Sequence, residues 1–164
     1  MAKKSKSMKS ILVSILTFLF AGGIFGMLAL PFVKIESSSI VHSYSKGYSA
    51  YSLLDFENNA ETSAVILVLM IFAGLLALTA IAKMVVDSSR NRKAGKIINA
   101  ILIFFGLAVL AVSIAAMIYI PSQCNAGSFG SLASGGAYAG WLGLSLTLVD
   151  AFLAFATSLF SLKK

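Results

Sequence analysis

The stretch Gly140–Phe160, GWLGLSLTLVDAFLAFATSLF, is a continuous apolar run interrupted by a single charged residue, Asp150. A helix needs about 20 residues to cross the hydrocarbon core of a bilayer, which is about 30 Å thick. Backbone groups in lipid must satisfy their own hydrogen bonds, so a run of this length favours a helix over a strand. The stretch therefore predicts a transmembrane helix with a carboxyl group near its middle.

Three more runs of the same kind precede it, so that four spans are expected at about 11–33, 64–82, 97–120 and 139–162. Hydrophobic residues make up 59% of the chain, against about 45–50% in soluble domains. The segments between the runs are too short to build a soluble domain with its own core. We predict an all-α membrane protein, in which residues 1–164 form one four-transmembrane-helix bundle.

Charge gives the expected orientation of the connections, which are outer loops at 34–63 and 121–138 and a cytoplasmic loop at 83–96. Eleven of the 13 basic residues lie on one side of this arrangement. They are Lys3, Lys4, Lys6, Lys9, Lys83, Arg90, Arg92, Lys93, Lys96, Lys163 and Lys164. The positive-inside rule places both termini in the cytoplasm, for a multi-pass protein of the plasma membrane.

The same basic residues are expected to meet lipid and not nucleic acid, because they follow the membrane topology. Contacts to anionic headgroups are worth about 1 kcal/mol for each basic residue near the surface. The candidates are Arg90, Arg92, Lys93 and Lys96. The first apolar run, of about 23 residues, exceeds the 7–15 of a signal-peptide core, so we expect an uncleaved span.

The first outer loop predicts a small β-hairpin. FVKIES (32–37) and SIVHSYS (39–45) are rich in β-branched and aromatic residues, with serines between them. A lone hairpin is marginal in water, so it should lie against the helix ends or a partner. The residues after it, Tyr48, Tyr51, Leu54 and Phe56, form either an interfacial aromatic belt or a partner-binding surface.

The second outer loop is uncharged and holds the only cysteine, Cys124. One cysteine excludes a disulfide within the chain, which leaves a free thiol or a bridge to a partner. His42 is the only histidine, and no cysteine–histidine spacing typical of a metal site occurs. We expect neither a metal nor a cofactor.

Asp150 lies on a line of small and polar residues when the last span is followed in alternating steps of three and four. That line is Gly140, Gly143, Thr147, Asp150, Ala154, Thr157 and Ser161. Such a line packs against neighbouring helices while bulky residues face lipid. We therefore predict that Asp150 points into the bundle or into a protein interface.

An unpaired carboxylate at this depth costs about 2.5–3.5 kcal/mol on insertion scales, and no Lys or Arg occurs inside the four apolar runs. Three interpretations stay open. Asp150 is a neutral acid hydrogen-bonded within the chain, it pairs with a group on another subunit, or it binds a proton or cation on a transport path. The candidate interaction residues are Asp150, Thr147, Thr157 and Asn99.

Glycines predict where helices approach closely. The first span carries Gly22-x-x-x-Gly26, and the third carries Gly106 at sevenfold spacing from Asn99 and Ser113. Small residues four apart permit close contact between membrane helices. The predicted packing positions are Gly22, Gly26, Gly106, Gly140 and Gly143.

Two segments carry a resemblance: LALPFVKIESSSIVHSYSKGYSAYSLLDF (28–56) and GAYAGWLGLSLTLVDAFLAF (136–155). They look like uncharacterised small four-span membrane proteins of bacteria, especially Gram-positive ones. The topology also resembles that of claudin-type tetraspans, with a larger first outer loop and inside termini. The paired cysteines and the Trp-containing motif of the claudin first loop are absent, so the resemblance implies topology alone.

The sequence offers no constellation for catalysis, such as a histidine-based dyad or a phosphate-cradling glycine loop. We expect a non-enzymatic accessory or structural subunit that binds a partner protein, or a homo-oligomer, through its helices or outer loop. The alternatives are a small oligomeric transporter or channel component with Asp150 on a proton or cation path, and a lysis or bacteriocin-immunity protein. No inverted repeat supports the transporter.

Overall fold

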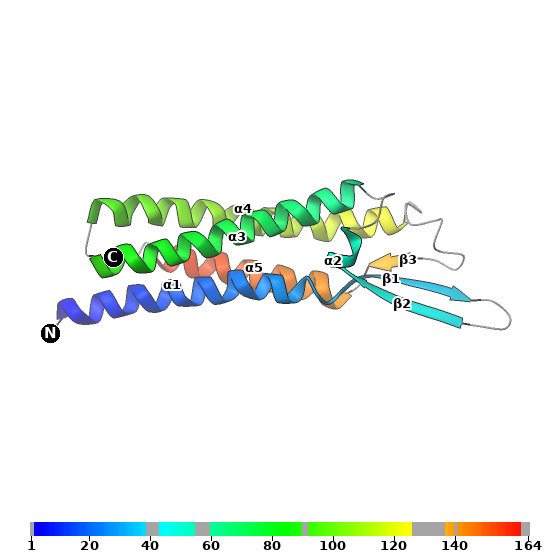
Figure 1. The fold of residues 1–164 in the computed structure, drawn as a ribbon, viewed down its shortest axis with the longest axis horizontal. Helices are drawn as coiled ribbons and strands as arrows, with labels where there is room; N and C mark the ends of the chain where they lie inside the picture. Colours follow the sequence, from blue (N-terminus) through cyan, green and yellow to red (C-terminus); the bar gives the residue numbers. More distant parts are fainter. Residues whose placement is uncertain are drawn as a thin grey trace.

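The computed structural model of the chain is a bundle of four long helices with a small sheet at one end (Figure 1). It describes residues 2–38, 43–54, 60–89, 92–125, 137–139 and 141–161. The elements are α1 (Ala2–Met27), β1 (Pro31–Ser38), β2 (Ser43–Ser49), α2 (Ala50–Leu53), α3 (Ala60–Ser89), α4 (Arg92–Asn125), β3 (Ala137–Ala139) and α5 (Trp141–Phe160). The predicted four-helix membrane fold with a hairpin is confirmed.

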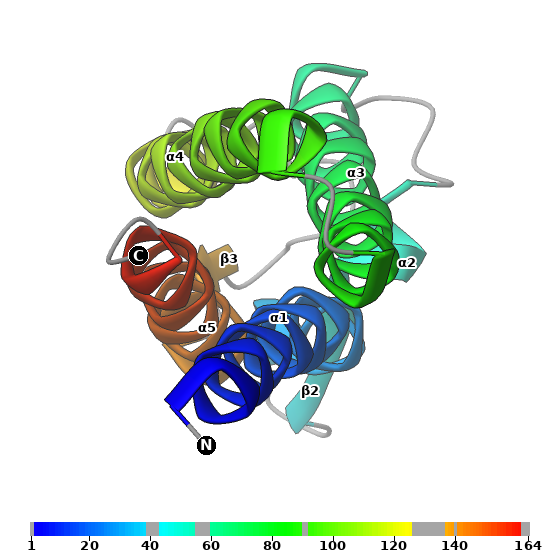
Figure 2. The ribbon, with the colours of Figure 1, turned by 90° about the vertical axis from the view of Figure 1, so that its left-hand side faces the viewer.

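Each of the four long helices contains a segment that is long and apolar enough to cross a membrane. These segments are Met8–Met27, Glu61–Ser89, Lys93–Cys124 and Leu142–Phe160. The chain is thus a multi-pass integral membrane protein. Seen along the bundle, the helices follow one another around a common centre in the order α1, α3, α4, α5, and each packs beside the next (Figure 2).

Both termini lie at one end of the bundle, which we call the terminal end, and the sheet lies at the other, the sheet end (Figure 1). Neighbouring helices run antiparallel, as in an up-down-up-down bundle. The helices also extend beyond some of the predicted spans. The α3 and α4 helices continue through most of residues 83–96, where we predicted a loop.

Buried residues recur on every helix in alternating steps of three and four. They are Ser10, Ser14, Thr17, Ala21 and Ile24 on α1, with Leu28 just after it, and Thr62, Ile66, Leu69, Ala73, Leu76, Ala80 and Lys83 on α3. On α4 they are Asn99, Leu102, Gly106, Val109, Ser113, Ala116 and Ile120, and on α5 Leu144, Thr147, Ala151, Ala154 and Ser158, with Ser161 just after it. A mean spacing of 3.5 residues is the pattern of left-handed bundles, with helices crossing at about 20°. We call these four lines the buried stripes.

The first helix ends earlier than predicted, at Met27, and the segment up to Val33 is not helical. Pro31 cannot continue a helix without losing a hydrogen bond, and it begins β1 instead. The last carbonyls of α1 find other donors. The hydroxyl of Tyr51 donates to the carbonyl of Phe25 at 2.8 Å, and the Ala50 amide donates to the carbonyl of Leu28 at 3.0 Å. The α2 turn therefore caps α1.

The sheet is antiparallel, in the order β2-β1-β3. A hairpin was predicted here, but its second strand, β2, spans Ser43–Ser49 and not 39–45. The third strand, β3, comes from the second predicted outer loop and pairs Ala137, Tyr138 and Ala139 with residues 33–35. It joins the two connections at the sheet end and carries the chain directly into α5. Ile40, His42 and Phe56 lie outside the described residues.

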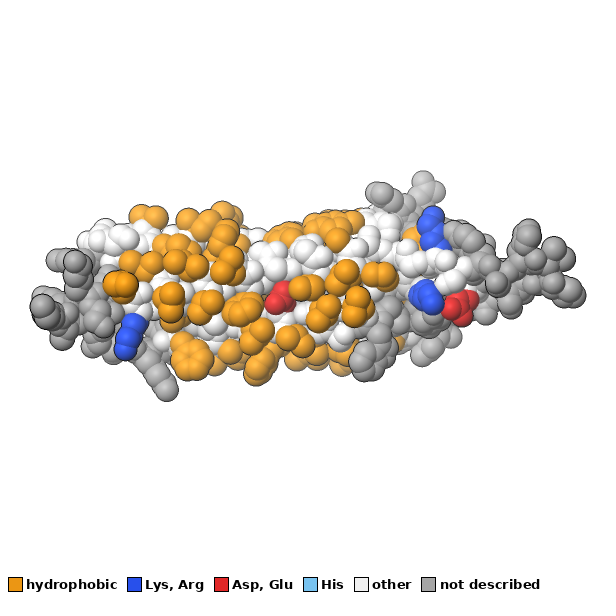
Figure 3. All heavy atoms as spheres, turned by 90° about the horizontal axis from the view of Figure 1, so that it is seen from below, with side chains coloured by type: hydrophobic (Ala, Val, Ile, Leu, Met, Phe, Trp, Pro, Cys, Tyr) orange, Lys and Arg blue, Asp and Glu red, His pale blue; other side chains and the backbone are white. Residues whose placement is uncertain are grey.

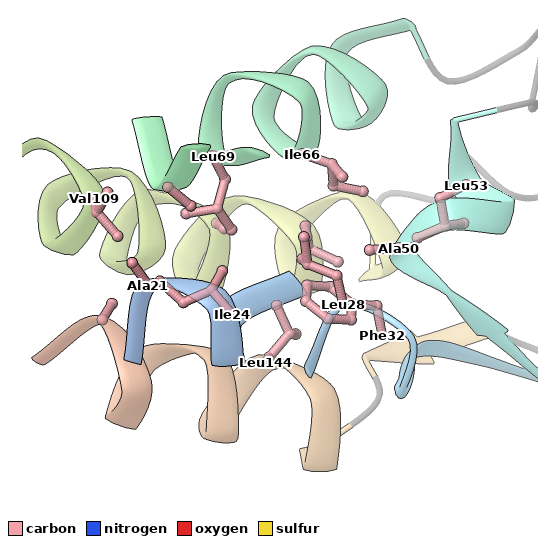
Figure 4. Packing of buried hydrophobic residues seen from close by; sticks show 14 of the residues in the cluster. Ala21, Ile24, Leu28, Phe32, Ala50, Leu53, Ile66, Leu69, Val109 and Leu144 are labelled. Carbon is pink, nitrogen blue, oxygen red and sulfur yellow. The ribbon is translucent and has the colours of Figure 1, made fainter. Parts of the chain in front are cut away.

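A β-bulge turns Phe32 into the protein core. Pro31 pairs with Ser49 and Val33 with Tyr48, so Phe32 is an extra residue on β1. Phe32 and Val33 are consequently both fully buried, although successive residues of a regular strand point to opposite faces. Phe32 belongs to the buried cluster that lies where the sheet meets the helices (Figure 4).

Candidate functional site

Asp150 lies next to the buried stripe of α5 and not on it. The stripe passes through Thr147, Ala151 and Ala154, so Asp150 occupies the flank that faces α1. Its side chain rests against Gly23: a Cβ built on that glycine would lie 2.5 Å from Oδ2. Gly23 is therefore the residue that allows the carboxyl to lie against the backbone of α1.

The carboxyl group of Asp150 lacks a hydrogen-bond partner for one of its two oxygens among the described residues. Its Oδ2 atom is buried and has no hydrogen-bond partner among the described residues, while the residue as a whole is partly exposed. Figure 3 shows acidic atoms midway along the apolar surface of the bundle, and Asp150 lies in the middle of α5. The chain thus presents a carboxyl to its surroundings at mid-bundle without neutralising it.

The two candidate threonines predicted on the same line as Asp150, Thr157 and Thr147, have other partners. The Thr157 hydroxyl lies 3.0 Å from the hydroxyl of Thr17 on α1 and also contacts the carbonyl of Leu153 at 2.9 Å. Thr147 is buried and donates to the carbonyl of Gly143 at 2.7 Å. Thr157 therefore joins α5 to α1, Thr147 bonds within its own helix, and Asp150 remains separate from both.

Two of the predicted packing glycines lie in tight contacts. A Cβ on Gly143 would meet the carbonyl oxygen of Pro31 at 2.7 Å and the ring of Phe32 at 2.6 Å. A Cβ on Gly106 would meet the Ser158 hydroxyl at 2.8 Å. Gly143 thus allows the bulged strand to pass close to α5, and Gly106 brings α4 close to α5.

Gly22 and Gly26 do not pack against another helix of this chain, contrary to our prediction. A Cβ on either glycine would meet nothing within 4 Å, and both residues are exposed. The close approach on α1 occurs at Gly23, between them. Gly22 and Gly26 do lie on one side of α1, as their spacing indicates, but that side faces away from the other helices of the bundle. Gly140 lies outside the described residues.

A buried ion pair near the terminal end was not predicted. Lys83 donates to Asp87 Oδ2 at 2.8 Å, and the two side chains are 0% and 4% exposed. Ser10 of α1 completes the cluster: its hydroxyl donates to the same oxygen at 2.5 Å and lies 3.2 Å from Lys83 Nζ. Our placement of Lys83 in a cytoplasmic loop is wrong, because α3 continues to Ser89.

The signal for this pair is present in the sequence. The buried stripe of α3 continues in its steps of three and four from Ala80 to Lys83 and then to Asp87. Residues four apart lie on the same helix face, so the lysine and the aspartate can neutralise one another there. A charged pair at successive stripe positions indicates a helix that continues, whereas hydropathy alone indicates a loop.

Other buried polar side chains gather at the same end. Asn99, 8% exposed, donates from Nδ2 to the carbonyl of Ser161 at 3.3 Å, which links α4 to α5. Its Oδ1 atom has no hydrogen-bond partner among the described residues. Ser14 and Ser158 are fully buried at the corresponding turns of their helices. The interior is therefore polar near the terminal end and mainly apolar near the sheet.

The predicted outer-loop surface is only partly available as a surface. Leu54 and Tyr48 pack against the core cluster, and Tyr51 caps α1. Lys46 Nζ lies 5.2 Å from the centre of the Tyr48 ring, a cation–π contact. Tyr51 remains partly accessible, so the surface predicted at these residues is smaller than the sequence indicates.

Three of the predicted headgroup-binding residues, Arg92, Lys93 and Lys96, lie in the first two turns of α4. Lys93 and Lys96 are exposed there, Arg90 falls outside the described residues, and the side chain of Arg92 is not described. Cys124 is a buried, free thiol near the end of α4. Within the described part of the chain, no three His, Cys, Asp or Glu residues come close enough together to hold a metal ion.

No family model, curated protein or solved structure matches the chain.

Proposed function

We propose that this membrane protein is a non-enzymatic accessory or structural subunit that binds a partner protein within the bilayer. The observation that supports this most is the carboxyl of Asp150, partly exposed at mid-bundle and without a hydrogen-bond partner for Oδ2 among the described residues. Ionisable residues inside membranes are costly, and they usually face protein or water and have a partner. A neighbouring subunit would provide that partner.

A proton or cation path is the second candidate, because polar residues such as Asn99 and Ser14 are buried near the terminal end. Its weakness is the geometry at mid-bundle. Asp150 lies on the flank of α5, while the stripe residues at its level, Ala151 and Ala154, are apolar and fully buried. A path through the centre would pass alanines and not the carboxyl. We therefore rank partner binding first.

For orientation, we propose that both termini are cytoplasmic in the plasma membrane. The asymmetric distribution of basic residues supports this, with Lys93 and Lys96 exposed near the terminal end. A reporter that is active only in the cytoplasm should be active when fused after Lys164. The same reporter inserted between residues 126 and 136 should be inactive. The opposite pattern of activities would contradict the orientation.

The test of the accessory-subunit proposal is the mass and composition of the particle extracted from native membranes in a mild, lipid-preserving detergent. We expect a defined complex with a second protein for the wild type, and loss of most of that protein in Asp150→Asn. The substitution keeps the shape of the side chain and removes its charge. A lone monomer, or a homo-oligomer that Asp150→Asn leaves unchanged, would contradict the proposal.

Asp150→Asn also needs a control for folding, because the carboxyl rests against Gly23. Thr157→Val provides one: it removes the hydroxyl that contacts Thr17, on the same flank of α5 but two turns away. If both variants fold and only Asp150→Asn loses the partner, the loss comes from the carboxyl and not from a weakened contact between α1 and α5.

A further inference from the structure

Four buried polar residues lie at one level of the bundle, near the terminal end. They are Ser14 on α1, Lys83 on α3, Asn99 on α4 and Ser161 just after α5, and each is at most 8% exposed. We call them the polar layer. We propose that the polar layer binds water in the core of the bundle, and that this site is closed toward the sheet end.

Contacts between neighbouring helices place the layer residues of α3, α4 and α5 at one level. A Cβ on Gly95 would lie 4.0 Å from Val86 Cγ1, so these two residues lie side by side on α4 and α3. Because the two helices are antiparallel, Lys83 and Asn99 both lie deeper in the bundle than this contact, by three and four residues. At 1.5 Å per residue they are within about 2 Å of each other along the axis. Asn99 in turn bonds to the carbonyl of Ser161.

Ser14 of α1 belongs to the same layer because its stripe meets Lys83. The Nζ atom of Lys83 lies 3.2 Å from the hydroxyl of Ser10. Ser14 is the next position of that stripe, one turn deeper in the bundle. Since the four helices surround a common centre (Figure 2), the layer contributes one polar residue from each side.

The hydrogen bonds within the layer leave acceptor atoms unused. The hydroxyls of Ser14 and Ser161 donate to backbone carbonyls, those of Ser10 at 3.1 Å and Ser158 at 2.6 Å. Asn99 donates from Nδ2, but its Oδ1 atom is buried and has no hydrogen-bond partner among the described residues. A buried acceptor without a donor is costly, and buried water commonly bonds to such atoms. Asn99 therefore indicates a ligand that donates a hydrogen bond.

The charges of the site favour a neutral ligand. The ammonium group of Lys83 disfavours a cation, and the carboxylate of Asp87, 2.8 Å from that ammonium, disfavours an anion. An ammonium group has three N–H donors, and Lys83 uses two of them for Asp87 and Ser10. The ligand therefore donates to Asn99 Oδ1 and can accept from Lys83. Water does both, and a buried water typically makes about three hydrogen bonds.

The next positions of the buried stripes close the site toward the sheet end. Ala80 and Leu102 are apolar and fully buried. Thr17, at the corresponding position on α1, already has partners for its hydroxyl, namely the carbonyl of Val13 at 3.0 Å and the hydroxyl of Thr157 at 3.0 Å. Water bound in the layer thus has few polar partners beyond it, which argues for a closed site and against a path through the bundle.

The test is water-edited solid-state NMR of the full-length, ¹⁵N-labelled protein in liposomes of phosphatidylcholine and phosphatidylglycerol. Magnetisation passes from water to nearby protein groups, and its build-up rate reports how close water lies. We expect build-up on the side-chain amide of Asn99 to be about threefold faster than on the backbone amide of Leu76. Leu76 is fully buried, two stripe positions deeper than Lys83. Loss of the signal in Asn99→Leu assigns it.

Two variants assign the water to the layer. Ser14→Leu fills space beside Asn99, so the build-up on Asn99 should fall to the rate of Leu76. Thr17→Val removes a hydroxyl one stripe position deeper without adding bulk, and it should leave the build-up on Asn99 unchanged. If Ser14→Leu does not fold, the comparison of Asn99 with Leu76 in the wild type decides the question.

Build-up on Asn99 as slow as on Leu76 would overturn the inference, because the layer would then be dry. Fast build-up on Asn99 that persists in a folded Ser14→Leu variant would also overturn it, since the water would lie outside the layer. Equally fast build-up on Asn99 and Leu76 would contradict a closed site and favour the proton or cation path. None of these outcomes depends on whether a partner binds at Asp150.

Discussion

Lys83→Met is expected to destabilise the bundle by about 3–5 kcal/mol, because it removes the lysine of a buried ion pair and leaves its carboxylate partner in the core. The hydroxyl of Ser10 would still donate to Asp87 Oδ2. The measurement is the free energy of unfolding in mixed micelles, followed by helix content. Lys93→Met removes an exposed lysine from the next helix and should change the stability by less than about 0.5 kcal/mol.

The double variant Lys83→Met/Asp87→Leu makes this prediction specific. Removing both charges from a buried pair and filling the space with apolar side chains is often neutral or stabilising. We therefore expect the double variant to recover most of the stability that the single variant loses. If Lys83→Met is no less stable than Lys93→Met, the pair is not buried in the folded protein, and α3 does not continue its buried stripe to Asp87.

Phe32→Ala is expected to cost about 3–5 kcal/mol, the range for removing a large aromatic side chain from a core. Phe32 is 0% exposed and packs where the bulged strand meets α5 at Gly143. The matched control is Phe152→Ala on α5, because Phe152 is 58% exposed on the surface of the bundle. The same unfolding measurement applies to both variants.

The comparison of the two phenylalanine variants tests whether the bulged strand β1 buries Phe32 in the core of the bundle. A large loss for Phe32→Ala with little change for Phe152→Ala would place Phe32 in the core. Comparable effects would contradict the bulge, since a regular strand would turn either Phe32 or Val33 away from the helices.

The helices and the hairpin were predictable because each is encoded by a long, characteristic run of residues. Runs of about 20 apolar residues leave few alternatives in a membrane protein. The β-branched and aromatic residues of the first outer loop indicate a hairpin, although its second strand begins four residues later than predicted. Strand β3 was not predictable, because three residues, Ala137–Ala139, carry too short a pattern. Its pairing depends on where α5 begins, which brings those residues beside β1.

The position of Asp150 was predicted to within one residue of helix register. A stripe through Asp150 and Thr157 and one through Ala151 and Ser158 are both small and polar, so composition does not separate them. The two differ by about 100° around the helix, which decides whether the carboxyl faces the centre or a flank. Contacts with α1, at Gly23 and Thr17, show that Asp150 and Thr157 lie on the flank.

Lys83 was misplaced for a different physical reason. Hydropathy counts a lysine as a charge, but most of its side chain is an aliphatic stem that can lie in a core. The cost of burying its ammonium group falls when a carboxylate and a hydroxyl receive it, as Asp87 and Ser10 do. Such compensation depends on pairs of residues and is invisible to any scale that scores residues one by one.

The most direct test of the partner-binding account is the oxygen accessibility of a spin label placed beside Asp150. The label would be attached to Leu153→Cys, one turn from Asp150 on the same side of α5, in a Cys124→Ala background and measured first on the isolated chain in liposomes and then on the native particle. We predict high accessibility in the isolated chain, because Leu153 is partly exposed there, and a marked decrease in the particle, where the partner covers this side of α5. Low accessibility in the isolated chain, or an unchanged value in the particle, would contradict the account.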